Sequence, residues 1–327
     1  MESRECPTVL ADPRDGTPLR LVWHDEFDGN APDPEKWNQF NRMWGGSDGR
    51  RRIITTKSDP RNLSVEHGKL VMRAWREPDA DGLAVYSTHE TLTTWNRMSF
   101  RYGYLEIRAR VPFERAMLPS CWFQSVPWHR SVDYMTEVDL FEPWWYAYIE
   151  SAMHKWYLTP PTRRSPSGCA YAHDWRPPVS FVIPGAERLH DEFHRYGFGW
   201  TPQEMYFTFD GNVYGRMDIT EDSDFGGRGC GGRETYSPEQ YGDRIRALGT
   251  GLTGMRGFHD PLAIHFTNFV KRGSKGFRHD EFITDEDQSV FPAIFSVDWV
   301  RLYQKPGEGA LFDDRAEIIR TEEETPG

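Results

Sequence analysis

Short hydrophobic segments separated by turn residues recur along the chain, whereas long runs with the 3.6-residue period of an amphipathic helix are scarce. The segments are rich in Val, Ile, Phe, Tyr and Trp, the residue types that favour β-strands. Strands are predicted over residues 21–23, 70–73, 102–111, 121–125, 135–141, 151–157, 206–209, 263–270 and 295–303. The pattern therefore predicts an all-β protein.

Local detail supports this interpretation. Charged residues occupy every second place in one strand, at Glu106, Arg108 and Arg110, which marks a face that is solvated or lines a cleft. The sequence Asp210-Gly211 follows another predicted strand and is a strong signal for a hairpin turn.

The chain has 327 residues, a length that allows either two domains or one large β-sandwich. No repeat and no Pro/Ser-rich linker divides it, so one main domain is predicted over residues 19–306. An N-terminal extension is expected over 1–18 and a frayed acidic tail over 307–327. The Gly- and Arg-rich segment 226–257 predicts a long loop of the kind that often borders a binding cleft.

The net charge of −11 argues against nucleic acid or an anionic membrane as the partner, because both require a basic face. No apolar run reaches the roughly 18 residues of a membrane span. The chain also carries 13 Trp, 14 Tyr and 20 Phe, which is more than a core needs, so some rings are expected to face a ligand. The four cysteines lack metal-site or redox spacing, and the choice between free thiols and disulfides stays open.

Three carboxylates interrupt the apolar strand at 135–141 and its continuation: Glu137, Asp139 and Glu142. In a regular strand the first two share a face and Glu142, five places after Glu137, points to the other. A one-residue bulge at Leu140-Phe141 returns all three to one face, and bulges are common beside active sites. The two glutamates would then lie about four strand steps of ~3.3 Å apart, close enough for leaning side chains to approach to about 5–6 Å.

That separation is typical of retaining glycosidases, in which one carboxylate attacks the anomeric carbon and the other acts as acid and base. Asp139 lies between the glutamates, where a shared hydrogen bond would tune a pKa and hold a rotamer. One alternative is an exposed acidic strand. Another is a Ca²⁺ or Zn²⁺ site to which His129, Asp133 and His154 contribute.

The three carboxylates form the pattern E-x-D-x-x-E, and with five further segments the chain resembles glycoside hydrolase family 16. The matching segments occur in the family's order and cover residues 21–29, 102–110, 192–200, 206–211 and 296–303. The resemblance implies a β-jelly-roll sandwich of two antiparallel sheets, with an open concave cleft for a polysaccharide. It also implies that Glu137 is the nucleophile, Glu142 the acid/base and Asp139 the assisting residue.

The bulged pattern is shared by laminarinase-like, agarase-like, porphyranase-like and carrageenase-like members of the family. Two substrate-holding segments, 119–124 and 267–273, depart from the usual family sequence. Together with the long insertion, these departures favour an endo-acting retaining hydrolase of a β-linked algal galactan, with or without sulfate, of the agar, porphyran or carrageenan type. The alternatives are a laminarin-like β-1,3-glucan endohydrolase and a non-catalytic glycan-binding protein on the same scaffold.

Sugar rings have an apolar face that stacks on aromatic side chains and hydroxyls that bind polar groups at the rims of a cleft. The candidate substrate-binding residues lie near the carboxylate strand or in rim loops: Trp44, Trp122, Trp144, His154, Trp156, Arg130 and Asn268. The alternatives are core positions for the tryptophans, a structural role for the histidine and solvated loop positions for the arginine and its companions at 163 and 164.

The family resemblance also implies a structural Ca²⁺ held by Glu26, the backbone at Gly68 and Asp298, against which a turn-capping role for Asp298 is the alternative. No cofactor is expected to be required. The polysaccharide is the expected partner, with neither nucleic acid nor membrane, and the protein is expected to be a monomer. Secretion or periplasmic export is expected, although the N-terminus shows no apolar signal-peptide segment.

Overall fold

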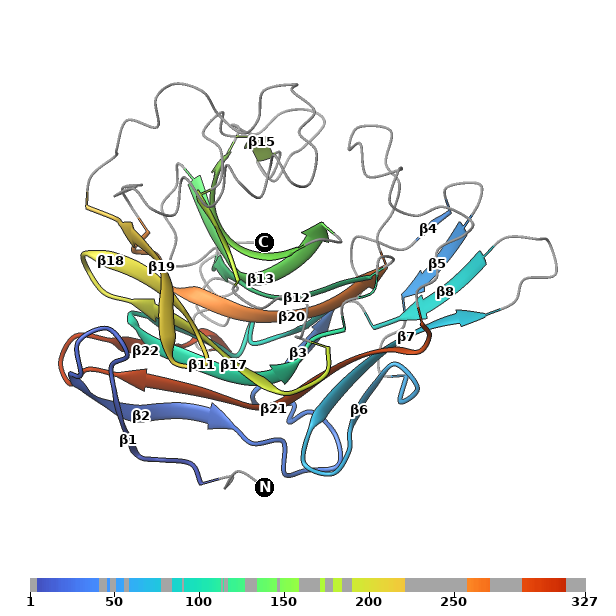
Figure 1. Cartoon of the computed structure of the whole chain (residues 1–327), viewed down its shortest axis with the longest axis horizontal. Helices are drawn as coiled ribbons and strands as arrows, with labels where there is room; N and C mark the ends of the chain where they lie inside the picture. The colour runs from blue at the N-terminus through green and yellow to red at the C-terminus, as the bar shows by residue number, and fades with distance from the viewer. Residues whose placement is uncertain are drawn as a thin grey trace, which may run out of the picture.

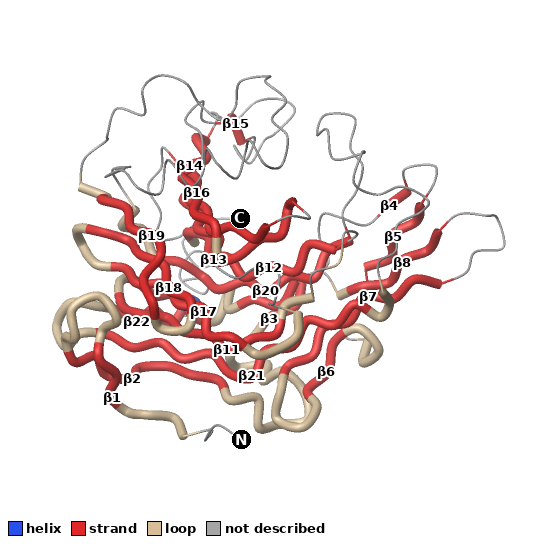
Figure 2. The backbone as a smooth tube through the Cα atoms, in the orientation of Figure 1, coloured by secondary structure: helices blue, strands red, loops and turns tan. Residues whose placement is uncertain are grey.

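A computed structural model of the chain describes residues 5–40, 46–47, 51–55, 59–77, 84–89, 91–112, 114, 117–126, 134–145, 148–158, 171–173, 179–183, 190–220, 258–270 and 290–315. Side chains are not described at residues 40, 46–47, 51–55, 84, 134, 144–145, 148, 155–158, 171–173, 179–182. The elements of this part of the chain are strands, arranged as two curled sheets that face each other (Figures 1 and 2). The predicted jelly-roll sandwich is thus confirmed. No helix among the described residues is both long and apolar enough to cross a membrane.

The first sheet runs in the order β19-β18-β17-β11-β21-β7-β8-β5-β4, with β2 also on β21, β1 on β2 and β6 on β7. Its strands are β1 (Val9–Ala11), β2 (Pro18–Asp25), β4 (Gly46–Ser47), β5 (Arg51–Thr55), β6 (Leu63–Val65), β7 (Leu70–Glu77), β8 (Ala84–Thr88), β11 (Gly103–Arg110), β17 (His194–Trp200), β18 (Glu204–Phe209), β19 (Asn212–Asp218) and β21 (Ala293–Gln304). The predicted turn between β18 and β19 has positive φ at Asp210 (48°) and Gly211 (83°), as a tight hairpin requires.

The second sheet runs in the order β15-β14-β13-β12-β20-β10-β22, with β16 on β14, and β9 joining β3 to β20. Its strands are β3 (Asn38–Phe40), β9 (Thr91–Thr93), β10 (Met98–Arg101), β12 (Met117–Ser125), β13 (Tyr134–Trp145), β14 (Tyr148–Leu158), β15 (Tyr171–His173), β16 (Val179–Val182), β20 (Leu262–Val270) and β22 (Ala310–Asp313). The carboxylate strand is β13, which lies inside this sheet between β12 and β14 (Figure 2).

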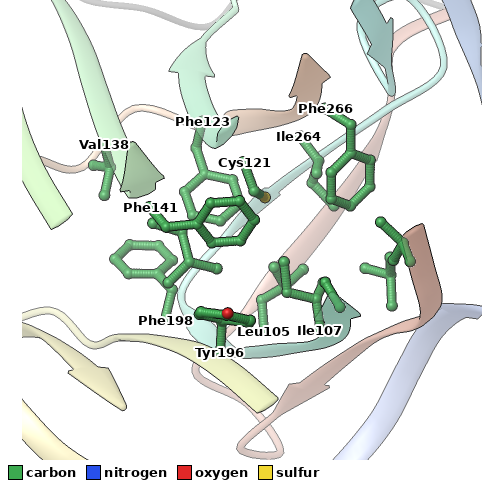
Figure 3. Close-up of a cluster of buried hydrophobic side chains, with 14 of the residues drawn as sticks. Leu105, Ile107, Cys121, Phe123, Val138, Phe141, Tyr196, Phe198, Ile264 and Phe266 are labelled. Carbon is green, nitrogen blue, oxygen red and sulfur yellow. The ribbon is translucent and has the colours of Figure 1, made fainter. Parts of the chain in front are cut away.

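The main hydrophobic core fills the space between the two sheets (Figure 3). The first sheet contributes residues such as Leu105 of β11 and Phe198 of β17, and the second contributes Phe123 of β12 and Phe266 of β20. Phe123 and Phe198 stack with their ring centroids 5.0 Å apart. Since side chains alternate along a strand, residues next to these core positions point away from the opposing sheet.

Both predicted domain boundaries need correction. Val9–Ala11 pairs with Pro18–Asp25, so much of the expected N-terminal extension belongs to the first sheet. At the other end, β22 pairs with β10, and the buried Asp314 accepts a hydrogen bond from Ser99 at 2.9 Å. Backbone pairing at a sheet edge, which composition does not reveal, incorporates both segments into the sandwich.

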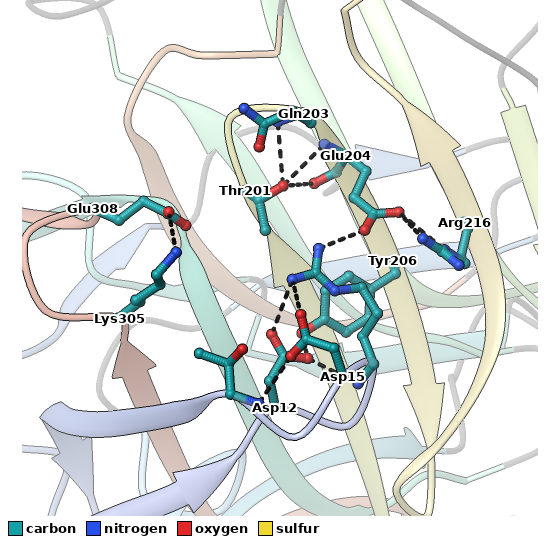
Figure 4. A network of polar contacts seen from close by, with 11 residues as sticks. Asp12, Asp15, Thr201, Gln203, Glu204, Tyr206, Arg216, Lys305 and Glu308 are labelled. Atoms are coloured by element: carbon teal, nitrogen blue, oxygen red, sulfur yellow. Dashed lines mark hydrogen bonds and ion pairs between the residues drawn. The ribbon is translucent and has the colours of Figure 1, made fainter.

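A polar network ties the N-terminal hairpin to the first sheet (Figure 4). The Tyr206 hydroxyl donates to Asp12 Oδ1 at 2.7 Å, and Arg216 donates to Glu204 Oε2 at 2.6 Å. Arg14, from the turn after β1, donates to the same Glu204 carboxylate. These contacts hold the hairpin against β18, which Arg216 in turn joins to β19.

Candidate active site

The predicted bulge on β13 is confirmed. Asp139 pairs with Ala152 of β14 and Glu142 pairs with Glu150, so three steps on β13 match two steps on β14. Leu140 and Phe141 are both fully buried in the core between the sheets. The extra residue lies between these carboxylates, and the alternation then places Glu137, Asp139 and Glu142 on the face away from the core.

Five polar side chains meet on this face. The carboxylates of Glu137 and Asp139 and the imidazole of His154 offer atoms that all lie within 4.8 Å of one another. His154 Nε2 lies 2.9 Å from Asp139 Oδ2, and Asp139 is also hydrogen-bonded to Glu142. Ser120 of β12 donates to Glu142 Oε1 at 3.4 Å. Asp139 thus lies close to Glu137 and is hydrogen-bonded to Glu142, and His154 contacts Asp139.

Burial controls the charge of this cluster. It raises the pKa of Asp139 well above the ordinary value, with a further contribution from the charge of Glu150, while the hydrogen bond to Glu142 opposes the rise. Burial, and then the charge of Glu142, raises the pKa of Glu150 to about 8. Burial lowers the pKa of His154, and the charge of Glu137 opposes this change. Burial therefore disfavours the charged forms of both His154 and Asp139.

Trp122 lies beside the carboxylates, in register with Asp139 across the β12–β13 pair. Its side chain is partly exposed and stacks on His265 of β20, with ring centroids 4.2 Å apart and an angle of 17° between the rings. Burial lowers the pKa of His265 to about 3, so the imidazole that stacks on Trp122 is neutral. The indole therefore forms a rigid, partly exposed flat surface next to the site.

The prediction that Asn268 contacts substrate is wrong. Its side chain is fully buried and donates hydrogen bonds to the carbonyls of Met72 at 3.1 Å and Ala293 at 3.5 Å, both in the first sheet. Asn268 shares the parity of the core residues Ile264 and Phe266 on β20, so it points between the sheets. Its role is to join the two sheets.

Several other predicted residues cannot be placed. Trp44 and Arg130 lie outside the described residues, as do the loop arginines at 163 and 164 and the two residues of the metal alternative at 129 and 133. Trp144 and Trp156 belong to β13 and β14, but their side chains are outside the described part of the structure. The predicted long loop at 226–257 is outside it too.

The predicted calcium ligands lie against cations of the protein itself. Arg301 donates to both carboxylate oxygens of Glu26 at 2.9 and 2.8 Å. Arg108 lies 2.6 Å from Asp298, with Lys69 at 4.0 Å. Carboxylates that are already neutralised in this way do not fit a site in which they would neutralise a divalent ion. Gly68 has a positive φ of 69°, which fits the turn between β6 and β7 without an ion. A structural Ca²⁺ at these residues stays a prediction.

Sequence reasoning missed two site residues, Glu150 and His265. Glu150 lies opposite Glu142, and His265 supports Trp122. Counting back from His154, which pairs with Glu137, could have placed Glu150 near the bulge. Nothing local marks His265, because its position depends on the pairing of β12 with β20.

The two free cysteines among the described residues are Cys6 and Cys121, and Cys121 lies in the core. Cys6 instead lies near His24 and Glu26, within 4.8 Å of both. Cys169 and Cys230 lie outside the described residues.

Comparison with known proteins shows the same fold and family. A β-glucanase of Rhodothermus marinus is 30% identical over 227 residues, which are 65% of this chain and 70% of that protein. The solved structure of SCLam, a non-specific endo-β-1,3(4)-glucanase of glycoside hydrolase family 16, superposes with a TM-score of 0.57 at 22% identity and covers 92% of this chain and 94% of its own. The endo-β-1,3-glucanase of Pyrococcus furiosus gives a TM-score of 0.56 at 19% identity over 91% and 98%. No family model matches the chain.

The relatives identify the class of protein that has this jelly-roll sandwich, with its carboxylates on a bulged strand, as a glycoside hydrolase. The protein belongs to glycoside hydrolase family 16.

Proposed function

We propose that the protein is an endo-acting retaining β-glucanase that cleaves a β-1,3-linked glucan of the laminarin type. Its support comes from the relatives, which include the β-glucanase of Rhodothermus marinus and a glucan endo-1,3-β-glucosidase of Cryptopygus antarcticus. They favour the glucan alternative over the galactan first expected from the two divergent segments. The observation that supports the catalytic part is the bulge that puts Glu137 and Glu142 on one face of β13, with Asp139 between them and hydrogen-bonded to Glu142.

In the first step Glu137 attacks the anomeric carbon while Glu142 protonates the departing glycosidic oxygen. The bond from carbon to the Glu137 oxygen forms as the glycosidic bond breaks, and the covalent intermediate retains one half of the chain. In the second step Glu142, now a carboxylate, takes a proton from water, whose oxygen displaces Glu137. Asp139 holds Glu142 in place through their hydrogen bond, and His154 in turn holds Asp139.

A polysaccharide panel tests the proposal. Purified enzyme is incubated with laminarin, lichenan, agarose, porphyran and κ-carrageenan, and reducing ends are measured. We expect release of mixed oligosaccharides from laminarin, with a β-anomeric first product by proton NMR. Cleavage of a galactan alone would reject the glucan proposal, and an α-anomeric first product would reject the retaining mechanism.

Trp122 is proposed to stack against a sugar ring next to the cleaved bond. We expect Trp122→Ala to lower kcat/KM on laminarin by about tenfold or more, because an aromatic platform contributes on the order of 1.5 kcal/mol or more. Trp122→Phe should restore much of the loss. Trp75→Ala is the matched control, because Trp75 is likewise a partly exposed tryptophan but lies on β7 of the first sheet, and it should leave kcat/KM unchanged. Equal losses in both variants would contradict the role of Trp122.

A further inference from the structure

Trp95, a tryptophan that the mechanism above does not use, contacts the same imidazole that supports Trp122. The His265 ring lies with its centroid 4.2 Å from that of Trp122 and 6.0 Å from that of Trp95. The imidazole side chain belongs to a residue that is 4% exposed, whereas both tryptophans are partly exposed. A buried ring thus contacts two indoles that both reach the surface.

Strand register places these rings on the face that carries the carboxylates. One row across β13, β12, β20 and β9 contains Asp139, Trp122, His265 and Thr93. Trp95 comes two residues after Thr93 and contacts the His265 ring, so it lies on this face as well. Among the described residues, neither indole belongs to the hydrophobic core between the sheets.

Hydrogen bonds fix the backbone around Trp95. The Thr94 amide donates to the Ile264 carbonyl of β20 at 2.9 Å, and the Ile264 amide donates to Thr94 Oγ1 at 2.9 Å. The Trp95 amide donates to Thr93 Oγ1 at 3.0 Å. A group that is held in place before binding loses little conformational freedom when a ligand arrives. The Trp95 backbone is therefore preorganised.

Stability alone does not explain a histidine under the two indoles. The Nε2 atom of His265 is buried without a hydrogen-bond partner among the described residues. Burying a polar atom in this way is costly, and an aliphatic side chain would fill the space without that cost. What the imidazole supplies instead is a flat ring that contacts both Trp122 and Trp95.

The two indoles are separate surfaces. Trp122 lies on β12, next to the carboxylate strand, whereas Trp95 follows β9, two strand spacings or roughly 10 Å further away. The His265 ring makes an angle of 17° with the Trp122 ring and 55° with the Trp95 ring, so the two indoles are not parallel. One sugar ring cannot stack on both.

We propose that Trp95 binds a sugar ring of the polysaccharide that is remote from the cleaved bond, while Trp122 binds a ring next to it. The chain would then run from the carboxylates across β12 and β20 to the end of β9. The inference rests on the proposed function only in that a glycan chain crosses the carboxylates, since any sugar ring with an apolar face can stack on an indole. It predicts an enzyme that prefers long chains.

The test is the dependence of kcat/KM on chain length, measured with oligosaccharides of defined length from the polysaccharide that the panel identifies. We expect Trp95→Ala to lose about three- to tenfold on the longest chains and to match wild type on the shortest oligosaccharide that is cleaved. Trp122→Ala should lose activity at every length, and the control Trp75→Ala at none. A loss in Trp95→Ala that does not grow with chain length would overturn the proposal.

Two further variants separate stacking from a structural role. Trp95→Tyr keeps an aromatic face and should retain most of the preference for long chains. Trp95→Leu still covers His265 but has no flat face, so it should lose this preference as Trp95→Ala does. Melting temperatures of all variants show whether each is folded. A Trp95→Leu enzyme that is folded and keeps the wild-type dependence on chain length would contradict stacking.

A binding measurement needs no catalysis and separates this inference from the proposed function. Affinity electrophoresis is run through gels that contain each polysaccharide of the panel, with Glu137→Gln as the parent protein so that cleavage does not occur during the run. We expect at least one polysaccharide to retard the parent, and Trp95→Ala to weaken that binding by about threefold or more. Unchanged retardation, or no retardation of the parent in any gel, would overturn the proposal. A loss seen only in a galactan gel would support the role of Trp95 while rejecting the glucan proposal.

Discussion

Glu137→Gln is expected to lower kcat on the best polysaccharide of the panel by roughly 10⁴-fold or more, which corresponds to about 5.5 kcal/mol of lost transition-state stabilisation. The amide is nearly isosteric with the carboxylate but cannot form the covalent bond to the anomeric carbon. Because Glu137 is only partly buried on the face away from the core, the melting temperature should change little. Initial rates from reducing-end release, with calorimetry of both proteins, measure the two effects.

The matched control is Glu77→Gln, at the end of β7 in the first sheet, where the carboxylate pairs with Arg61 at 2.9 Å on the surface. This variant should retain wild-type kcat, since a surface ion pair contributes about 1 kcal/mol or less and only to stability. A Glu137→Gln enzyme that keeps more than about one-tenth of wild-type kcat would show that another group is the nucleophile.

Glu142→Ala is expected to have the second-largest effect, a loss of about 10²–10⁴-fold on polysaccharide, the usual contribution of a general acid/base. With an aryl β-glycoside as the substrate, the leaving group needs little protonation, so the rate of the first step should fall much less. Azide should then accelerate turnover, because this small anion attacks the covalent intermediate without needing a general base. Kinetics with both substrates, with and without azide, check these expectations.

The stereochemistry of the azide product assigns the two glutamates independently of rates. A β-glycosyl azide from Glu142→Ala means that Glu137 formed the intermediate and azide displaced it. An α-glycosyl azide from Glu137→Ala means that azide attacked the substrate directly in place of the nucleophile. If Glu142→Ala gave the α-glycosyl azide and Glu137→Ala the β-glycosyl azide, the roles assigned to the two glutamates would be reversed.

The sequence predicts the bulge because strand alternation is a strict rule. With a period of two, Glu142 can join Glu137 and Asp139 only if one residue is inserted between them, and the structure has the register shift there. The same rule and the β-rich composition predict the strands that carry the site, from β12 to β14 and β20.

The alternation of polar and apolar residues does not predict which face of its strand Asn268 occupies. Strand β20 is buried along nearly its whole length, so polar and apolar positions do not alternate and the pattern does not tell one face from the other. The family-like position of Asn268 indicated substrate, whereas its parity with Ile264 and Phe266 directs it between the sheets. A neighbouring residue, His265, faces the site instead and supports Trp122.

By itself the sequence determined the fold class, the family and the three carboxylates, because each depends on spacing along one strand or on ordered local segments. Only the tertiary structure decided which residues meet those carboxylates from other strands. Glu150 lies opposite Glu142, and His265 lies under Trp122, through registers set by hairpins and by the pairing of strands distant in sequence. Cross-strand register depends on how whole strands align, and no local pattern on a single strand specifies its partners.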